Sequence, residues 1–333
     1  MRMALQIAKV GGVFRSRLPF VLVIALRIST ILPMKSFTLL CVFGVALASA
    51  FAAEPAQPDR TINLWENAPP GDFSAPGPEI LSGPKPTDKA PIQRLTNVTA
   101  PRLEFYLPAK KNGSAVIIVP GGGFGVLASE HEGSELATWF RDRGFVAAVL
   151  EHRCPTNKLP KPWFFPAQDA QRAVSLLRSK ADEFGVKPDR IGLFGFSAGG
   201  QVALIAATNN SARFYPAADA IDQVICRPDF LMLCYPWHIL ADNSLTALKP
   251  EVRIGPKTPP TFLAQADDDP ASFAEGSTLA FLALRTAKVP AELHIYATGG
   301  HGFGLRPAVG KQAPGDWPGR LELWLKARGL MPE

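Results

Sequence analysis

The sequence predicts an α/β fold with a mostly parallel central sheet of about eight strands and helices on both faces. Short apolar runs alternate along the chain with longer segments of helical periodicity, which is the pattern of a chain that winds repeatedly from strand to helix. The apolar runs are continuous, and this is typical of strands covered on both sides. With 333 residues, 47% of them hydrophobic, the chain is long enough to bury a large core in one globular domain.

The expected strands are apolar runs bounded by turn residues. They lie at 102–108, 114–120, 145–153, 190–196, 229–236, 259–267 and 291–300. The expected helices show apolar residues at helical spacing, several with a glycine at or just past the end. They lie at 133–144, 166–185, 198–209, 276–289 and 314–329. Residues 236–259, rich in proline and polar residues, occupy the place where a small lid is expected.

The chain divides into a leader at 1–52, an arm at 53–92 and a globular domain at 93–333. In the leader, a start-like Met34 and Lys35 precede an apolar stretch, which is the form of a secretory signal peptide. Small residues stand at plausible cleavage positions, namely Ala48, Ala50 and Ala52. The arm is dense in proline, glycine and polar residues, so we expect it to be extended on the domain surface.

Residues 1–33 lie upstream of that signal, and Arg27 interrupts their apolar stretch. Two interpretations stay open, an over-extended gene start and a membrane anchor. Under both, we expect the domain to be secreted or periplasmic, with membrane contact only through an uncleaved leader.

The net charge of +6 does not indicate a basic domain. Six of the 35 basic residues precede the first acidic residue, Glu54, and the remaining 29 equal the 29 acidic residues. A nearly neutral domain argues against an electrostatic grip on nucleic acid or on an anionic membrane.

Three cysteines follow the leader, Cys154, Cys226 and Cys234. Their spacing matches no zinc pattern, and three cysteines in an exported protein permit at most one disulfide. Whether that disulfide forms stays open.

The strongest motif is Gly195-Phe196-Ser197-Ala198-Gly199, which follows an expected strand and begins an expected helix. In such a nucleophile elbow the serine is held in a strained turn that exposes its hydroxyl, and glycines take the positions where side chains would collide with neighbouring backbone. The structural alternative is an ordinary glycine-rich turn. The strand before the motif and the helix after it favour a nucleophilic Ser197.

A serine nucleophile requires a histidine and a carboxylate later in the chain. His301 lies in a glycine-rich loop after the last expected strand and is the predicted base. The other four histidines, one of them in a strand and the others at element ends or in the lid segment, fit this role less well. Asp267, Asp268 and Asp269 end another strand, and residue chemistry does not choose among them.

Gly121-Gly122-Gly123-Phe124 follows the strand at 114–120 and is expected to supply an oxyanion hole. Consecutive glycines leave their N–H groups unobstructed. A phosphate site is the alternative, but the spacing fits neither a P-loop nor a dinucleotide fingerprint.

Taken together, these residues resemble those of the α/β-hydrolase family, in particular its secreted bacterial branch of carbohydrate esterases related to acetylxylan and feruloyl esterases. The resemblance extends over nearly the whole chain after the leader. The segments that carry it are PGGGFGVLASEHEG, FPAQDAQRAVSLLRSKA, PDRIGLFGFSAGG, PPTFLAQADDDP and AELHIYATGGHGFGL.

The resemblance implies a nucleophilic Ser197, a base His301 and an orienting carboxylate Asp269, with Asp268 as the alternative. It implies oxyanion donors at the amides of Gly122, Gly123 and Ala198. The sequence departs from the family pattern at three positions, which are Pro120, Gln201 and Gln265, where many relatives have histidine. The resemblance also implies an α/β-hydrolase fold with a reduced lid.

The expected function is hydrolysis of acyl esters, acetyl foremost, of a carbohydrate or a similar small alcohol, through an acyl-enzyme. Neither a metal nor an organic cofactor is expected, and the expected partner is the small or oligosaccharide ester itself. Aromatic residues near the motifs are candidate pocket walls, namely Phe124, Phe196, Trp237 and Phe303. Two alternatives stay open, a peptidase of the prolyl-oligopeptidase type and an inactive carbohydrate- or partner-binding relative.

Overall fold

A computed structural model describes residues 56–86, 88, 92–306, 314 and 316–332. The predicted leader lies outside the described residues. The central sheet consists of β1 (Arg60–Asn63), β4 (Arg102–Tyr106), β5 (Ala115–Val119), β6 (Val146–Glu151), β7 (Ile191–Phe196), β8 (Phe230–Cys234), β9 (Thr261–Ala266) and β10 (Ala291–Tyr296). Two short strands, β2 (Ile80–Ser82) and β3 (Arg94–Thr96), form a separate antiparallel pair.

The helices match the predicted segments, with ends that differ by a few residues. They are α1 (Glu135–Arg141), α2 (Phe164–Ser179), α3 (Ala181–Phe184), α4 (Ser197–Thr208), α5 (Ala274–Thr286) and α6 (Trp317–Ala327). The segment expected as one helix at 166–185 divides into α2 and α3, and Gly185 ends the second with a left-handed φ of 64°. A π-helix, η1 (Glu130–Ser134), precedes α1, and a 3₁₀ turn, η2 (Ala220–Gln223), precedes β8.

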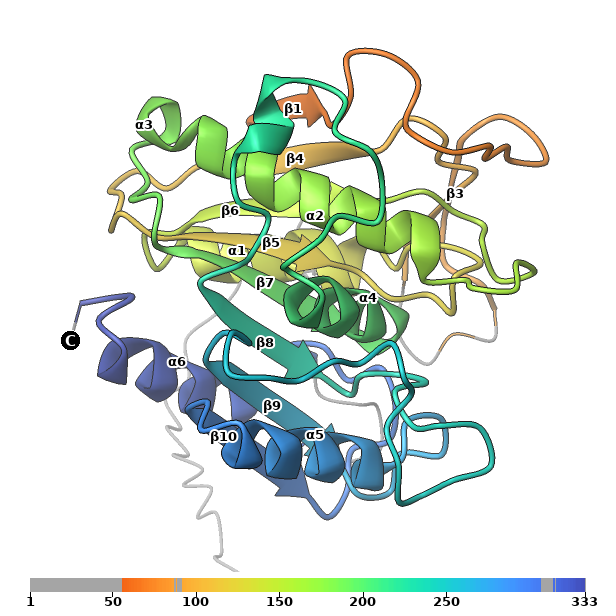
Figure 1. Ribbon diagram of the computed structural model, residues 1–333, viewed down its shortest axis with the longest axis vertical. Coiled ribbons are helices and arrows are strands. Elements are labelled where there is room, and N and C mark those ends of the chain that lie inside the picture. Colours follow the sequence, from red (N-terminus) through yellow and green to blue (C-terminus); the bar gives the residue numbers. More distant parts are fainter. Residues whose placement is uncertain (1–55, 87, 89–91, 307–313, 315, 333) are drawn as a thin grey trace, which may run out of the picture. The chain divides into compact units, whose positions relative to one another are not determined.

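The sheet order is β1-β4-β6-β5-β7-β8-β9-β10 (Figure 1). The six strands from β6 to β10 are mutually parallel, whereas β4 pairs antiparallel with β6 and β1 antiparallel with β4. The predicted mostly parallel sheet is therefore confirmed. The eighth strand was not expected where it lies: β1 belongs to the arm, and its sequence RTIN is largely exposed and has no apolar run to predict it.

Alternate residues of the buried strands face two separate layers of core. Ile117, Leu193 and Leu263 pack with apolar residues of α2, α4 and α5. Ile118, Phe194 and Phe262 point the opposite way and pack with residues of α1 and α6. Helices thus cover both faces (Figure 1), and this double burial explains the continuous apolar runs of the strands.

The chain order reverses between β5 and β7. From β5 the chain passes to β6 on one side, and it then returns through α2 to β7 on the other side, with Val119 opposite Gly195. Ligand sites of open α/β sheets lie at such a reversal, beyond the carboxyl ends of the strands. The loops after β5 and β7 are the two glycine-rich motifs of the sequence.

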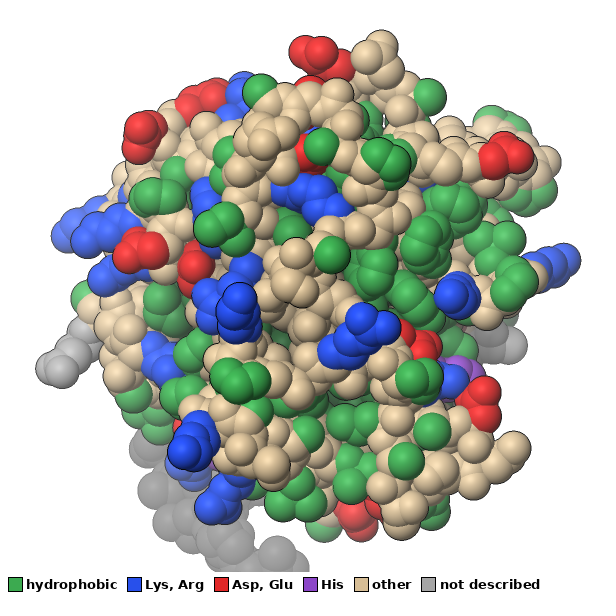
Figure 2. All heavy atoms as spheres, viewed as in Figure 1, with side chains coloured by type: hydrophobic (Ala, Val, Ile, Leu, Met, Phe, Trp, Pro, Cys, Tyr) green, Lys and Arg blue, Asp and Glu red, His purple; other side chains and the backbone are tan. Residues whose placement is uncertain are grey.

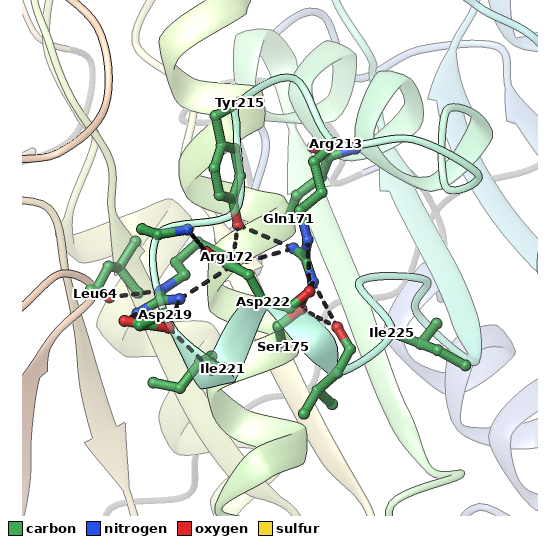
Figure 3. A network of polar contacts seen from close by, with 12 residues as sticks. Leu64, Gln171, Arg172, Ser175, Arg213, Tyr215, Asp219, Ile221, Asp222 and Ile225 are labelled. Carbon is green, nitrogen blue, oxygen red and sulfur yellow. Dashed lines mark hydrogen bonds and ion pairs between the residues drawn. The ribbon is translucent and has the colours of Figure 1, made fainter.

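A buried ion-pair network ties α2 to η2 and to the segment after β1 (Figure 3). The guanidinium of Arg172, 1% exposed, lies 3.0 Å from an oxygen of Asp222 and donates at 2.6 Å to Asp219. Its Nε also donates to the carbonyl oxygen of Leu64 at 2.8 Å. The Tyr215 hydroxyl completes the network by donating to Asp222 at 2.8 Å.

All three cysteines after the leader carry free thiols in buried positions, so the disulfide that the sequence left open is not formed. Among the described residues, no helix is long and apolar enough to cross a membrane. Acidic and basic side chains both occur on the face shown in Figure 2, in keeping with the balanced charge of this part of the chain.

Candidate active site

Ser197 lies at the junction of β7 and α4 with a φ of 50°, in the left-handed region that a residue with a side chain rarely adopts. Phe196 before it is still extended, so the chain turns within one residue. The backbone N–H of Trp237 donates to the Ser197 carbonyl at 2.8 Å and holds the turn from the side of β8. The serine hydroxyl is thereby presented at the carboxyl edge of the sheet.

The glycines around Ser197 are required by close backbone contacts. A Cβ on Gly199 would lie 2.1 Å from the carbonyl oxygen of Val119 in β5. A Cβ on Gly195 would lie 2.3 Å from the Gly199 oxygen. Both distances are far inside van der Waals contact, so only glycine lets α4 start this close to β5 and β7.

The structure brings His301 to Ser197 across 104 positions of sequence. Nε2 of His301 lies 2.8 Å from Oγ of Ser197, and Nδ1 lies 2.8 Å from Oδ2 of Asp269. Because an ionised carboxylate only accepts, the proton sits on Nδ1, and Nε2 is left to accept from the serine hydroxyl. The Asp269 side chain is fully buried, whereas that of His301 is 26% exposed and reachable from solvent.

The three adjacent aspartates have different positions. Oδ1 of Asp269 accepts from the backbone N–H groups of Ala271 at 2.8 Å and of Ser272 at 2.9 Å, which leaves Oδ2 for the imidazole. Asp268 instead accepts from the Gly300 N–H at 2.6 Å and braces the loop that carries His301. Asp267 is exposed. The carboxylate in contact with His301 is thus the one that the family resemblance indicates.

The predicted oxyanion donors belong to the loop after β5 and to the start of α4. Gly122 and Gly123 have positive φ values of 130° and 61°, and within the described part of the chain their N–H groups donate to no protein acceptor. Ala198 is the second residue of α4, where backbone N–H groups have no partner within the helix. These amides are available to an anionic oxygen near Ser197, and the positive end of the α4 dipole favours one there.

The candidate pocket residues divide into two kinds. Phe124 and Trp237 line a cavity of about 190 Å³ beside Gly123, with ring centroids 6.1 Å apart. Phe196 is wholly buried against Phe194, and Phe303 is 3% exposed and packs on Tyr235. Both side chains lie in the core layer formed with α1 and α6. That they wall a substrate pocket stays a prediction.

The cavity beside Gly123 has aromatic and polar walls. Trp163 and Trp237 contribute indoles, and Asn157, Gln201 and Lys249 contribute polar groups. Figure 2 shows hydrophobic side chains gathered around the N-terminal end of α2, where several aromatic rings pack on one another.

A second cavity, of about 580 Å³, lies between the segment after β8 and the start of α5. Its walls include Ile239, Leu245 and Phe273. His238 lines both cavities, and burial together with the nearby Lys249 lowers the pKa of its imidazole. The expected lid at 236–259 contains no helix, and its regular structure is one antiparallel β-bridge between Leu240 and Leu248.

Two polar residues that the sequence did not single out also reach the site. Glu132 accepts from the Gly121 N–H, and Tyr235 packs its ring edge against the His301 imidazole with centroids 5.1 Å apart. Glu132 stands in a run with Glu130 and Glu135, and nothing in a single sequence distinguishes the three. Gln265, one of the departures from the family pattern, donates from its side-chain amide to the Ser272 carbonyl at 2.8 Å, three residues after Asp269.

The chain is similar to known hydrolases in sequence and in structure. Residues 165–313 match the model of the dienelactone hydrolase family, and residues 103–225 match the family model BD-FAE. The crystal structure of an acetyl ester-xyloside bifunctional hydrolase from Caldicellulosiruptor lactoaceticus is 31% identical, with a TM-score of 0.65. The match covers 84% of this chain and all of that one. The chain belongs to the α/β-hydrolase family.

Curated relatives point to the same carbohydrate-esterase branch of these hydrolases. An acetylxylan esterase of Xylanibacter ruminicola is 27% identical over 219 residues, 60% of this chain. An endo-1,4-beta-xylanase B of Butyrivibrio fibrisolvens is 28% identical over 205 residues, 56% of this chain. The matches cover 43% and 32% of those two proteins, so this hydrolase aligns with less than half of either.

Gly199→Ala should destabilise the hydrolase by about 2 kcal/mol or more, because the added methyl must displace the backbone at Val119. Urea denaturation followed by tryptophan fluorescence measures the loss. Gly255→Ala is the matched control, since a Cβ there meets nothing within 4 Å. Equal midpoints for the two variants would contradict the steric explanation of the elbow.

Proposed function

We propose that this hydrolase is an exported serine carboxylesterase that removes acyl groups, acetyl foremost, from carbohydrates or similar small alcohols. The hydrogen-bond chain from Ser197 through His301 to Asp269, with 2.8 Å at each contact, carries this proposal. A buried carboxylate, an imidazole and a strained serine arranged in series are the parts of an acyl-transfer triad.

In the first half of the reaction, Oγ of Ser197 attacks the ester carbonyl carbon while Nε2 of His301 takes the hydroxyl proton. Asp269 holds the imidazole in the tautomer with Nδ1 protonated and stabilises the cation that forms. The imidazolium then gives its proton to the departing alcohol oxygen, and the acyl group remains on Ser197.

In the second half, water attacks the acyl carbon and His301 takes a proton from it. Collapse of the second tetrahedral intermediate releases the carboxylic acid and returns the proton to Ser197. In both intermediates the former carbonyl oxygen carries negative charge, and the amides of Gly122, Gly123 and Ala198 would donate to it.

The cavity beside Gly123 supports a carbohydrate as the alcohol part of the ester. Indole faces such as that of Trp237 suit the apolar face of a sugar ring, and the amides of Asn157 and Gln201 suit its hydroxyls. The similarity to proteins named acetylxylan esterase and acetyl ester-xyloside hydrolase supports acetyl as the acyl group.

Ser197→Ala should lower the hydrolysis of p-nitrophenyl acetate by roughly a thousandfold or more, because the covalent intermediate is no longer formed. The stability of the variant should stay near that of the wild type. A fluorophosphonate probe should label the wild-type protein at Ser197 and leave the variant unlabelled, as mass spectrometry would detect. Retained turnover or retained labelling would refute Ser197 as the nucleophile.

A substrate panel should show the highest kcat/KM for acetyl esters, a fall with acyl length, and release of acetate from acetylated xylan. Acetyl, butyryl, octanoyl and feruloyl esters make up the panel, with aminoacyl amides to detect peptidase activity. Preference for octanoyl or feruloyl esters would overturn the acetyl proposal. Faster cleavage of the amides would instead favour the peptidase alternative.

Export is supported by the signal-like residues 34–52. Expression from Met34 in a Gram-negative host should yield a periplasmic or extracellular protein whose N-terminus lies just beyond Ala48, Ala50 or Ala52. N-terminal sequencing of the exported fraction checks this. Recovery of an uncleaved cytoplasmic protein would contradict export.

A further inference from the structure

We infer that Glu132 is a positioning residue whose buried carboxylate holds the oxyanion loop and, through Tyr235, the loop that carries His301. This inference rests on the proposed function, because the two loops have a common purpose only if Ser197 is acylated. It adds a residue that neither the triad nor the oxyanion amides include.

The two oxygens of the Glu132 carboxylate have separate partners. Oε2 accepts from the backbone N–H of Gly121 at 2.9 Å, and Oε1 accepts from the hydroxyl of Tyr235 at 2.9 Å. Nε2 of His131 lies 3.6 Å from the same Oε1. Glu132 is 3% exposed, so water does not compete for these contacts. A buried charge of this kind is strongly held by the groups that donate to it.

On one side, Glu132 sets the position of the backbone that precedes the oxyanion amides. A Cβ on Gly121 would lie 2.7 Å from Cβ of Ser197, so this backbone rests directly against the nucleophile. The Gly121 carbonyl accepts from the N–H of Ala128 at 2.9 Å while its N–H donates to Glu132. Because Gly122 follows directly, movement of Gly121 would move the oxyanion donors relative to Ser197.

On the other side, Tyr235 connects Glu132 to the loop of the base. Its hydroxyl donates to Glu132 and accepts from the Gly304 N–H at 3.0 Å, three residues beyond His301. Its ring packs against the His301 imidazole. Burial, together with the charge of Glu132, raises the pKa of the Tyr235 phenol, so the hydroxyl keeps the proton that it donates.

Glu132 lies within the π-helix η1 and is one of its buried residues. The wider hydrogen bond of η1 joins the Ser134 N–H to the Ser129 carbonyl at 3.0 Å, and π-helical turns often lie at functional sites. The two neighbouring glutamates of the same stretch have a different partner: Glu130 and Glu135 both form ion pairs with Arg306.

The chain also contains a close chemical copy of this contact away from the site. The carboxylate of Asp222 accepts from the Tyr215 hydroxyl at 2.8 Å and from the Ala218 N–H at 2.8 Å (Figure 3). It is buried like Glu132, but it joins η2 to α2, and neither of these elements supplies a triad or oxyanion residue. Asp222→Asn and Tyr215→Phe are therefore matched controls for Glu132→Gln and Tyr235→Phe.

The test compares the kinetics of these four variants on p-nitrophenyl acetate. Glu132→Gln should lower kcat and kcat/KM together by about 100-fold. The displaced oxyanion donors would stabilise the transition state less well, whereas binding of the neutral ester would not change. Tyr235→Phe should also lower both kcat and kcat/KM. The activity of the double variant should be little lower than that of the less active single variant, since both substitutions break one shared hydrogen bond. Asp222→Asn and Tyr215→Phe should lower the unfolding midpoint and keep kcat.

Unchanged kcat in folded Glu132→Gln, or a fall in kcat equal to that of Asp222→Asn, would overturn the inference. If Glu132→Gln does not fold, Tyr235→Phe decides, since it removes a single oxygen atom, and wild-type kcat in that variant would also overturn it. The rate of fluorophosphonate labelling separates this outcome from failure of the proposed function. Absence of wild-type labelling at Ser197 would refute the esterase, whereas equal labelling of the wild type and Glu132→Gln would refute only the positioning role.

Discussion

The site depends on one close contact between backbones, that of Gly199 at the start of α4 with the carbonyl of Val119 at the end of β5. Because β5 and β7 are hydrogen-bonded neighbours, a helix that leaves β7 at once must rise directly beside the end of β5. Absence of a side chain permits this approach. It also places the strained Ser197 next to Gly121, and so brings the proposed nucleophile to the loop of the proposed oxyanion donors.

The parallel sheet makes neighbours of segments that are far apart in the chain. The loops after β5, β7, β9 and β10 all leave the same edge, and the His301 loop reaches Ser197 over the end of β8. The space over β8 is filled by Tyr235, which packs on His301 and bonds to Glu132. Buried polar groups require hydrogen-bond partners, and here the polar groups of three loops bond to one another.

The predictions from sequence succeeded where burial imposes a pattern and failed where it does not. The continuous apolar runs became the core strands because helices cover both faces of the sheet. The strand β1 was missed because its residues are mostly exposed and form no apolar run. Phe196, a candidate pocket wall in the sequence, packs in the core layer of α1 and α6, since side chains of a strand alternate between faces.

The sequence by itself determined the order of strands and helices and the chemical types at the elbow, the glycine loop and the His301 loop, because periodicity and glycine requirements are local. Tertiary structure decided which of three adjacent aspartates meets the imidazole. Asp268 binds the Gly300 amide and Asp269 binds His301. The tertiary structure also decided that Glu132, rather than Glu130 or Glu135, bonds to the Gly121 N–H. These contacts depend on distances between residues that are remote in sequence, and strand register and loop conformation set those distances. Neighbouring carboxylates of the same chemical type cannot be distinguished from the local sequence.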